Sequence, residues 1–358
     1  MFKKLDLWLI IPIIILSIFS VLILGGMAIG NQNLTILYKQ LGFVLISFLV
    51  MFIFSKIDYR IYKNNPIILN IIYIIFTGLL VSLLIFGQTT RGIKGWLSVG
   101  FFSIQPVEFM KIILILVLAK YFSTRNMFLW NFKHIFISGI YTLIPCLLVL
   151  AQPDLGAAVI LFIIWISMIS VSGIKIKHLA LILGSLLLVS ILSFVFLLKP
   201  YQKERITAFV NPSLDTRGIN YNAKQSMIAI GSGRLFGKGL SFGTQTQLNF
   251  LPESKTDFVF AAIAEEIGLV GMIIVFSSFA IIVYKLFFYL TKTSDNFAFL
   301  LIFGLMIKIS TETLINIGVN VGFFPVVGIA LPFLSMGGSH LLADFILLGI
   351  VLNTQKKS

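Results

Sequence analysis

The chain has 358 residues, of which 58% are hydrophobic and only 11% charged, and its mean hydropathy is +1.04. A soluble domain carries about 25% charged residues, because its surface must be covered with polar groups. This composition excludes an ordinary soluble protein and predicts an integral membrane protein. The net charge of +14 does not indicate a nucleic-acid partner, since the basic residues lie between apolar runs, where they orient a chain in a membrane.

Apolar runs separated by polar residues predict an all-α bundle of about ten transmembrane helices. A run of about 20 apolar residues crosses the hydrocarbon core. The connections are short except for the one from Lys199 to Asp257, so we expect one polytopic domain over residues 1–358, with a long loop at about 199–257 between helices seven and eight. The predicted spans are 7–25, 37–55, 66–86, 103–122, 134–150, 155–172, 179–198, 258–286, 297–320 and 337–353.

The basic residues predict which way the bundle faces. Cytoplasmic loops are enriched in Lys and Arg, and the rule holds best for short loops. With a cytoplasmic N-terminus, the short outer segments hold only Lys39, Arg91 and Lys94. We therefore expect an inner-membrane protein with both termini in the cytoplasm and the long loop outside. The inward segments hold Lys3, Lys4, Lys56, Arg60, Lys63, Lys120, Arg125, Lys133, Lys175, Lys177, Lys285, Lys292, Lys356 and Lys357.

Two of the outer cations, Arg91 and Lys94, lie in one short loop that ends at Trp96. They either contact lipid headgroups beside this interfacial tryptophan or dock an anionic headgroup, since basic loop residues at a membrane surface suit phosphate. The next outer turn contains Asp154, which is either an N-cap of the sixth helix or a functional acid. The single cysteine, Cys146, lies in an apolar run and excludes a disulfide framework or a cysteine-based metal site.

Several ionisable residues fall inside predicted spans, where they are costly unless they are paired or line a wet cavity. Glu108 and Lys111 share one helical face and can pair. A structural salt bridge and a cavity lining are both open, and we favour the cavity because apolar residues would stabilise a helix in lipid equally well. Lys308 and Glu312 form an i,i+4 pair with an expected structural role in the bundle interior. Other polar residues inside spans are Glu265, Glu266 and Asp344.

The long loop is rich in aromatic residues and in glycine between Gly231 and Gly239. The aromatic residues argue against disorder, and the glycines permit close backbone approach. The spacing does not match a P-loop. At the end of the loop, Thr256 or Asp257 would cap the eighth helix. Alternatively, Asp257 is a general base at the water–lipid boundary, where partial desolvation favours proton uptake. A phosphate nearby would be held by Lys255, Arg234 or Lys238.

A series of short motifs runs along the chain, from Gly95-Trp96-Leu97 and Gln105-Pro106-x-Glu108-x-x-Lys111 to Gly243-Thr244-Gln245 and Ser335-x-Gly337-Gly338-Ser339. Together they resemble the SEDS (shape, elongation, division, sporulation) family, in particular its RodA-type branch. The resemblance covers nearly the whole chain in family order. Two departures are Arg234, where members usually have a further glycine, and the stretch from Met336 to His340. The matching segments are Gly95-Trp96-Leu97, Gln105-Pro106-x-Glu108-x-x-Lys111, Gln152-Pro153-Asp154-Leu155-Gly156, Tyr221-Asn222-x-x-Gln225-Ser226, Gly243-Thr244-Gln245-x-Gln247 to Asp257, Asn316-Ile317-Gly318, Leu331-Pro332-Phe333 and Ser335-x-Gly337-Gly338-Ser339.

The resemblance implies a peptidoglycan glycosyltransferase that polymerises lipid II at the outer face of the cytoplasmic membrane, with loss of undecaprenyl pyrophosphate, for cell elongation and rod shape. It implies that Asp257 matches an essential aspartate and that Glu108 and Lys111 match a functionally important pair. It also implies a class B penicillin-binding protein (a transpeptidase) and other elongation-complex membrane proteins as partners. Further substrate-binding or supporting residues would be Gln225, Gln245, Glu253, Ser254, Thr256 and Ser335.

The mechanism expected from these residues is inverting glycosyl transfer. Asp257 would deprotonate the acceptor 4-hydroxyl, and a lipid pyrophosphate would leave without a general acid. Its charge would be stabilised by Arg91, Lys94, Lys111 or Lys238, or by a divalent cation such as Mg²⁺ or Mn²⁺. The competing hypotheses are a lipid II flippase or other transporter and a catalytically silent scaffold. A transporter should place its polar groups near the midplane, whereas here they concentrate at the outer face.

Overall fold

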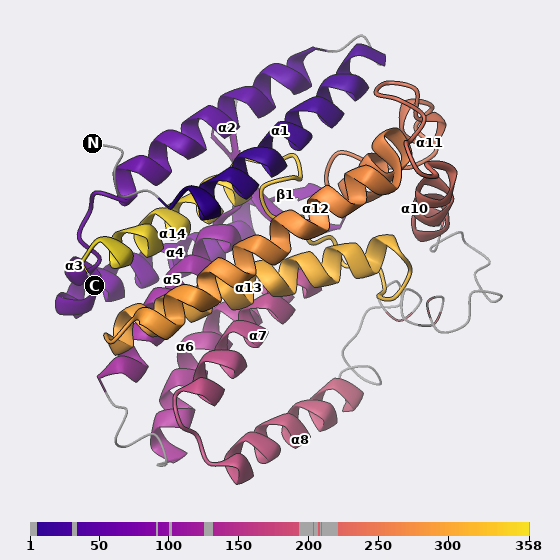
Figure 1. The fold of residues 1–358 in the computed structure, drawn as a ribbon. Coiled ribbons are helices and arrows are strands. Elements are labelled where there is room, and N and C mark those ends of the chain that lie inside the picture. The colour runs from indigo at the N-terminus through magenta and orange to yellow at the C-terminus, as the bar shows by residue number, and fades with distance from the viewer. Residues whose placement is uncertain are drawn as a thin grey trace.

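The computed structural model describes residues 6–30, 34–90, 92–99, 102–124, 132–192 and 221–357, with the isolated residues 203, 207 and 209. Each of the ten predicted spans coincides with a helix of a bundle (Figure 1). The part of span 179–198 that follows α8 lies outside the described residues. The ten helices are α1 (Leu7–Gly30), α2 (Thr35–Phe54), α4 (Pro66–Phe86), α5 (Pro106–Ser123), α6 (Phe132–Ala151), α7 (Leu155–Val171), α8 (Ile176–Leu192), α12 (Val259–Lys292), α13 (Asn296–Asn320) and α14 (Gly338–Lys357).

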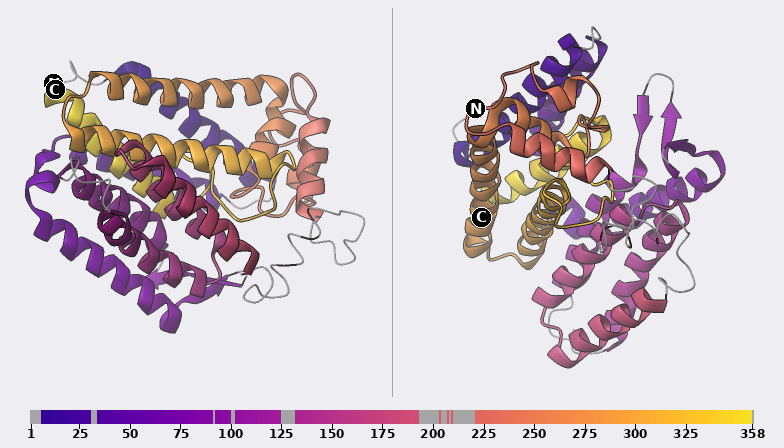
Figure 2. Two further views of the ribbon diagram at one scale, coloured as in Figure 1. Left: turned by 90° about the horizontal axis from the view of Figure 1, so that it is seen from below. Right: turned by 90° about the vertical axis from the view of Figure 1, so that its right-hand side faces the viewer.

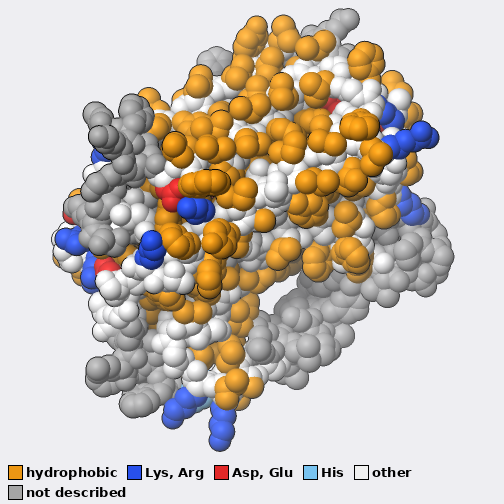
Figure 3. All heavy atoms as spheres, viewed as in Figure 1, with side chains coloured by type: hydrophobic (Ala, Val, Ile, Leu, Met, Phe, Trp, Pro, Cys, Tyr) orange, Lys and Arg blue, Asp and Glu red, His pale blue; other side chains and the backbone are white. Residues whose placement is uncertain are grey.

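The apolar surface of the bundle confirms a multi-pass membrane protein. Six of the described helices, α1, α2, α4, α6, α12 and α13, are long and apolar enough to cross a membrane. Large apolar side chains face outward along them, as on α4, where Ile67 is 71% and Ile74 is 67% exposed. Figure 3 shows hydrophobic side chains spread over one face of the molecule. Charged residues such as Lys308 are instead fully buried, the reverse of a soluble protein.

The start of α1 and the end of α14 lie at the same end of the bundle, which we call the terminal end. There Asp6 accepts hydrogen bonds from Lys285 and Tyr289 near the end of α12, and Asn353 accepts one from the backbone of Tyr59. The short helix α3 (Arg60–Asn64) connects α2 to α4 at this end. The opposite end, called the site end, holds the folded part of the long loop, α10 (Tyr221–Ser232) and α11 (Thr244–Gln247).

A three-stranded antiparallel sheet between α4 and α5 was not predicted. It consists of β1 (Gln88–Thr90), β2 (Ile93–Val99) and β3 (Phe102–Ile104), in the order β1-β2-β3. β1 and β2 project from the bundle (Figure 2, right). The predicted span 103–122 therefore starts too early, because its first two residues belong to β3 and the helix begins at Pro106, whose fixed φ suits the first helical position.

Two irregular segments shape the site end. Helix α12, which lies beside α13 (Figure 2, left), is interrupted at Gly268, whose φ of 77° and ψ of −159° are not helical. Between α13 and α14, residues 321–337 form no helix, yet Leu331 and Phe333 are fully buried. Non-helical backbone at such depth must find hydrogen-bond partners within the protein. We call residues 321–337 the crossing segment.

Candidate active site at Asp257

Asp257 lies where the long loop enters α12, and three consecutive carbonyl groups are fixed there. The carbonyl oxygen of Lys255 accepts a hydrogen bond from Met336 N at 2.8 Å, and that of Thr256 accepts one from Ser335 Oγ at 2.6 Å. The carbonyl oxygen of Asp257 accepts two, from the side-chain amides of Asn316 at 2.9 Å and Asn320 at 3.0 Å. The backbone of the aspartate is therefore held by α13 and the crossing segment.

Asn320 also completes the start of α12. Its Oδ1 accepts a hydrogen bond from Ala261 N at 3.0 Å, which satisfies one of the N–H groups that a first helical turn leaves unpaired. The N-cap position is occupied by Phe258, which offers no side-chain cap. The expectation that Thr256 or Asp257 is the N-cap is therefore wrong. The physical reason is that a buried side chain from α13 supplies the acceptor instead.

The Asp257 carboxylate lies beside the crossing segment in a partly exposed position. A Cβ built on Gly328 would be 3.7 Å from its Oδ2, an ordinary van der Waals distance, so this part of the crossing segment lies directly beside the carboxylate. The crossing segment also packs against the start of α7, since a Cβ on Gly156 would lie 2.6 Å from the carbonyl oxygen of Val327. Asp154 caps α7 by accepting a hydrogen bond from Ala157 N at 2.9 Å, which confirms the structural alternative for Asp154.

The predicted ion pair of Glu108 and Lys111 is present, with 2.8 Å between Glu108 Oε1 and Lys111 Nζ, and both residues are buried. Lys111 Nζ also lies 2.8 Å from Glu312 Oε1, and Lys308 Nζ lies 2.7 Å from Glu312 Oε2 and contacts Asp344. All five residues are at most 7% exposed. Glu312 thus joins the two predicted pairs into one network across α5, α13 and α14. We call these five residues the charge network, and its burial confirms the interior placement of Lys308 and Glu312.

A polar stripe on α13 connects the charge network to Asp257. Lys308, Glu312, Asn316 and Asn320 follow one another at intervals of four residues, and all are at most 3% exposed. Side chains four apart lie on one helical face, and twelve residues span about 18 Å. Asn316 was predicted only as part of a motif, and Asn320 was not predicted as a site residue. The signal that would have found both is the four-residue spacing of polar residues in an apolar span.

Other predicted site residues support the local backbone. The Thr256 hydroxyl donates to Glu253 Oε2 at 3.1 Å, and the Glu253 carbonyl oxygen accepts from Phe258 N at 3.1 Å. Ser254 is buried and its hydroxyl lies 3.8 Å from Met27 Sδ of α1. Ser335 is fully buried, and its hydroxyl oxygen accepts from Leu331 N at 2.8 Å. These contacts bring the end of the loop, the crossing segment and α1 together.

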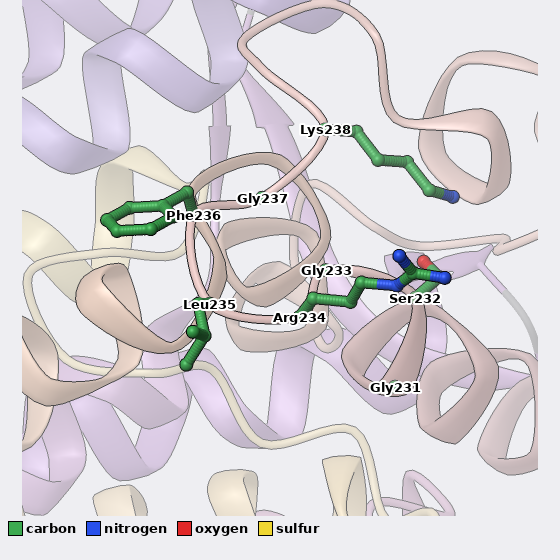
Figure 4. Close-up of a pocket in the computed structure, with 8 residues that line it drawn as sticks. All are labelled: Gly231, Ser232, Gly233, Arg234, Leu235, Phe236, Gly237 and Lys238. Atoms are coloured by element: carbon green, nitrogen blue, oxygen red, sulfur yellow. The ribbon is translucent and has the colours of Figure 1, made fainter.

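Lys238 and Gln245 lie in a second cluster, around Glu265. Lys238 Nζ is 2.8 Å from Glu265 Oε1, which also accepts a hydrogen bond from Gln245 N at 2.9 Å. The Gly231–Lys238 segment lines an open cavity of about 880 Å³, and Figure 4 shows the side chains of Arg234 and Lys238 pointing to the same side of it. Arg234 has a φ of 50°, in the region that favours glycine, as expected for a position where the resemblance implies glycine.

Two further predicted site residues, Lys94 and Gln225, lie on β2 and α10. Lys94 is exposed on β2, and its backbone N–H donates to the carbonyl oxygen of Gln152 at 3.2 Å, so β2 rests on the turn before α7. Gln225 is half-buried on α10, which is tied to α13 by a 2.8 Å hydrogen bond from Ser226 to the Asn320 carbonyl oxygen. Arg91 lies outside the described residues. Within the described residues, no three His, Cys, Asp or Glu side chains are grouped to hold a metal ion.

Fold and site together define a polytopic helical membrane protein with a carboxylate fixed at one end of its bundle. The family model described as Cell cycle protein, which covers FtsW, RodA and SpoVE, matches residues 1–358. The chain belongs to this family, and the resemblance to SEDS proteins is thereby confirmed.

One curated relative is the peptidoglycan glycosyltransferase MrdB of Escherichia coli K12, 32% identical over 345 residues that cover 96% of this chain and 92% of the relative. Among solved structures, a chain of a peptidoglycan synthase complex that coordinates polymerization and crosslinking superposes with a TM-score of 0.81. It is 25% identical, and 98% of this chain and 97% of that chain are covered. The rod shape determining protein RodA of Thermus thermophilus has a TM-score of 0.74 at 25% identity, with 99% and 98% covered.

Proposed function

We propose that Asp257 is the catalytic base with which this chain polymerises lipid II into glycan strands. The chain is a peptidoglycan glycosyltransferase of the FtsW, RodA and SpoVE family, like its Escherichia coli relative. The observation that carries the role of Asp257 is its placement, a partly exposed carboxylate whose backbone is fixed by Asn316, Asn320 and the crossing segment. A base has to keep a constant position relative to the hydroxyl that it deprotonates.

The proposed reaction is a single inverting displacement. The Asp257 carboxylate takes the proton of the acceptor 4-hydroxyl, whose oxygen forms a bond to the anomeric carbon of the donor. The bond from that carbon to the lipid pyrophosphate breaks, and the pyrophosphate leaves with the electron pair. A pyrophosphate is stable as an anion, so no acid has to protonate it, unlike the alkoxide leaving group of a glycosidase. Cations or a divalent ion such as Mg²⁺ or Mn²⁺ would stabilise its charge.

The ion pairs of the candidate lysines favour the loop of the β-sheet as the source of the positive charge that stabilises the leaving pyrophosphate. Lys111 already bridges Glu108 and Glu312, and Lys238 already pairs with Glu265. Lys94 is exposed and pairs with no carboxylate among the described residues. Lys94 is hydrogen-bonded through its backbone to Gln152, in the turn that leads into α7. The start of α7 packs against Val327, and the next residue, Gly328, lies beside the Asp257 carboxylate. We therefore assign the pyrophosphate to Lys94 and its loop neighbour Arg91.

Labelled lipid II, the purified chain and a class B penicillin-binding protein partner test the assignment. Wild type should form glycan chains, and Asp257→Asn should form none. Asp295→Asn, a carboxylate at the terminal end, is the matched control and should retain activity. Equal polymer from wild type and Asp257→Asn would overturn the role of Asp257. Polymer with the anomeric configuration of the donor would overturn inversion, and transport of lipid II without polymer would favour the flippase.

The proposed setting is the cytoplasmic membrane, with both termini inside, residues 1–358 as one polytopic domain and the site end outside. The basic residues of the inner loops and the shared terminal end of α1 and α14 support this orientation. A class B transpeptidase and other elongation-complex proteins are the proposed partners, supported by the similarity to a chain of a peptidoglycan synthase complex. Lys94→Cys should be labelled by an impermeant thiol reagent added outside cells, and Lys63→Cys should not. The reverse pattern would overturn the orientation.

A further inference from the structure

A cavity at the terminal end, far along the chain from Asp257, has the composition of a lipid-binding site. It has a volume of about 390 Å³ and lies between the start of α4, the end of α5 and the first half of α6. Its polar lining includes Asn70, Lys120 and Thr124, and its apolar lining includes Leu69 and Ile137. The cavity therefore combines one cation and several hydrogen-bonding groups with apolar walls, between helices that face lipid.

Hydrogen bonds and ring contacts fix the positions of the aromatic side chains at the inner wall of this cavity. The hydroxyl of Tyr73 donates to the carbonyl oxygen of Tyr141 at 2.9 Å, and their rings meet edge to face at 5.5 Å. The hydroxyl of Tyr121 is hydrogen-bonded to His134 Nδ1 at 2.9 Å. Because these rings are held by each other across three helices, the cavity does not depend on the rotamer of one side chain.

Lys120 gives the cavity a positive charge that the protein does not neutralise. The residue is half-buried, and its ammonium group has no hydrogen bond or ion pair among the described residues. No carboxylate lines the cavity, and the sequence contains no Asp or Glu in residues 59–107 or 109–153. The nearest acid on α5, Glu108, is twelve residues from Lys120, or about 18 Å along the helix. An anion is therefore the ligand that complements this site.

The surroundings distinguish a lipid from a small anion. Exposed apolar side chains flank the cavity on α4, where Ile71 is 51% and Ile74 is 67% exposed. They also flank it on α6, where Phe136 is 62% and Ile140 is 40% exposed. These surfaces face the hydrocarbon and would accommodate acyl chains, whereas a free phosphate would gain nothing from them. Basic pockets between transmembrane helices on the cytoplasmic side bind anionic headgroups.

We propose that this cavity binds an anionic glycerophospholipid of the cytoplasmic leaflet, with its phosphate at Lys120 and Asn70 and its acyl chains along α4 and α6. The lipid would hold the three helix ends together at the membrane surface. The proposal rests on the orientation given above and not on the role of Asp257. Its readout is lipid binding, so it can fail while the polymerase assignment stands, and the reverse also holds.

The test measures thermal unfolding of the full chain in detergent while phosphatidylglycerol is titrated in. Wild type should be stabilised by phosphatidylglycerol and much less by phosphatidylcholine, because a ligand that binds only the folded state raises the melting temperature. Lys120→Gln should weaken the apparent affinity about fivefold, as expected for one lysine near an anionic surface. Asn70→Phe, which fills the cavity from an exposed position, should also weaken it.

Lys56→Gln is the matched control, since Lys56 is exposed at the same end of the bundle but does not line the cavity. Its affinity for phosphatidylglycerol should equal that of wild type. Equal losses in Lys56→Gln and Lys120→Gln would overturn the site in favour of general surface attraction. Equal stabilisation by inorganic phosphate would overturn the lipid assignment in favour of a free anion. The melting temperatures without added lipid separate both outcomes from a folding defect.

Discussion

The charge network and the interruption of α12 at Gly268, which we call the break, bury polar groups in two different ways. In the charge network, two lysines and three acids on three regular helices form ion pairs with one another, and Glu312 is shared by Lys111 and Lys308. At the break, the carboxylates of Glu265 and Glu266 are also almost fully buried. Their partners, however, are mainly uncharged groups of the loop, with one lysine at the rim. They are the backbone N–H groups of Ser241, Gln245 and Thr246 and the side chains of Thr244, Thr246 and Gln247.

The break explains why the glycine-rich part of the loop is needed. The interruption at Gly268 frees carbonyl groups before it and N–H groups after it. Lys238 N and Gly239 N donate to the carbonyl oxygens of Glu265 and Glu266 at 2.9 and 3.0 Å. Leu269 N and Val270 N donate to the carbonyl oxygens of Arg234 and Leu235 at 2.9 and 3.3 Å. The loop replaces the missing helical hydrogen bonds, which is possible only if two backbones approach closely.

The two regions should therefore tolerate different kinds of substitution. The charge network depends on the charge of side chains, since removal of one partner breaks buried ion pairs and changes the balance of charge among the residues that remain. The break depends on the absence of side chains, because backbone meets backbone there. Substitutions that change charge should therefore damage the first region most, and added methyl groups should damage the second.

The largest effect is expected for Glu312→Leu, which removes two buried ion pairs at once and leaves Lys111 with Glu108 alone and Lys308 with Asp344 alone. Breaking a buried ion pair by removing one partner costs about 3–5 kcal/mol, so the melting temperature in detergent should fall strongly. Leu314→Ala, at a 67% exposed position on the same helix, is the control and should change it little. A Glu312→Leu protein as stable as wild type would show that the network is not coupled through Glu312.

A smaller loss is expected for Gly233→Ala. The added Cβ would lie 1.8 Å from the carbonyl oxygen of Ala264, so the loop could not remain seated at the break. Overpacking of this kind costs about 1–3 kcal/mol, measured as the loss of thermal stability. Gly231→Ala is the matched control: it lies on α10 with open space around the new Cβ and should be neutral or slightly stabilising. Equal destabilisation by both would contradict the close backbone contact.

Asn320→Leu tests whether the polar stripe positions Asp257. The substitution removes the hydrogen bonds to the Asp257 carbonyl oxygen and from Ala261 N. A small displacement of a catalytic group costs up to about 100-fold in rate, so kcat should fall at least tenfold while KM for lipid II changes little. The outcome against a positioning role is an unchanged kcat, or a fall in activity that only follows the amount of folded protein.

The smallest effect is expected at the terminal end, where the pair of Lys63 and Asp295, at 2.8 Å, is exposed to water. Burial alone would raise the pKa of Asp295, but the hydrogen bond from Lys63 and the one from Phe297 N lower it below its ordinary value. A carboxyl group with a lowered pKa stabilises the fold above its unfolded-state pKa of about 3.9 and loses that contribution as the pH falls further.

Asp295→Asn should therefore cost less than about 1 kcal/mol near neutral pH. The difference in melting temperature from wild type should shrink as the pH is lowered from 6 to 3, since protonation removes the same charge in wild type. Asparagine can still serve as the N-cap of α13, so the helix start is retained. A higher melting temperature of Asp295→Asn than of wild type near neutral pH would mean that ionised Asp295 destabilises the native state.

Much of the bundle was predictable because hydropathy is a local property. The ten spans, the i,i+3 pair of Glu108 and Lys111, the i,i+4 pair of Lys308 and Glu312, and the capping option for Asp154 all follow from neighbours in the chain. The β-sheet before α5 was missed because apolar residues near Phe102 extend the hydropathy of the following helix. Hydropathy alone does not distinguish a short apolar strand from the start of an apolar span.

A membrane bundle with a glycine-rich, aromatic loop that ends at Asp257 could be predicted from the order of the amino acids alone. The way in which Asp257 is held depends on contacts between segments far apart in the chain. Asn316 and Asn320 are 59 and 63 residues from Asp257, Ser335 bonds its neighbour Thr256 across 79 residues, and Glu312 joins Lys111 across 201. Burial obliges every polar group to find a partner. Which partner it finds depends on the packing of helices, and no local pattern records that choice.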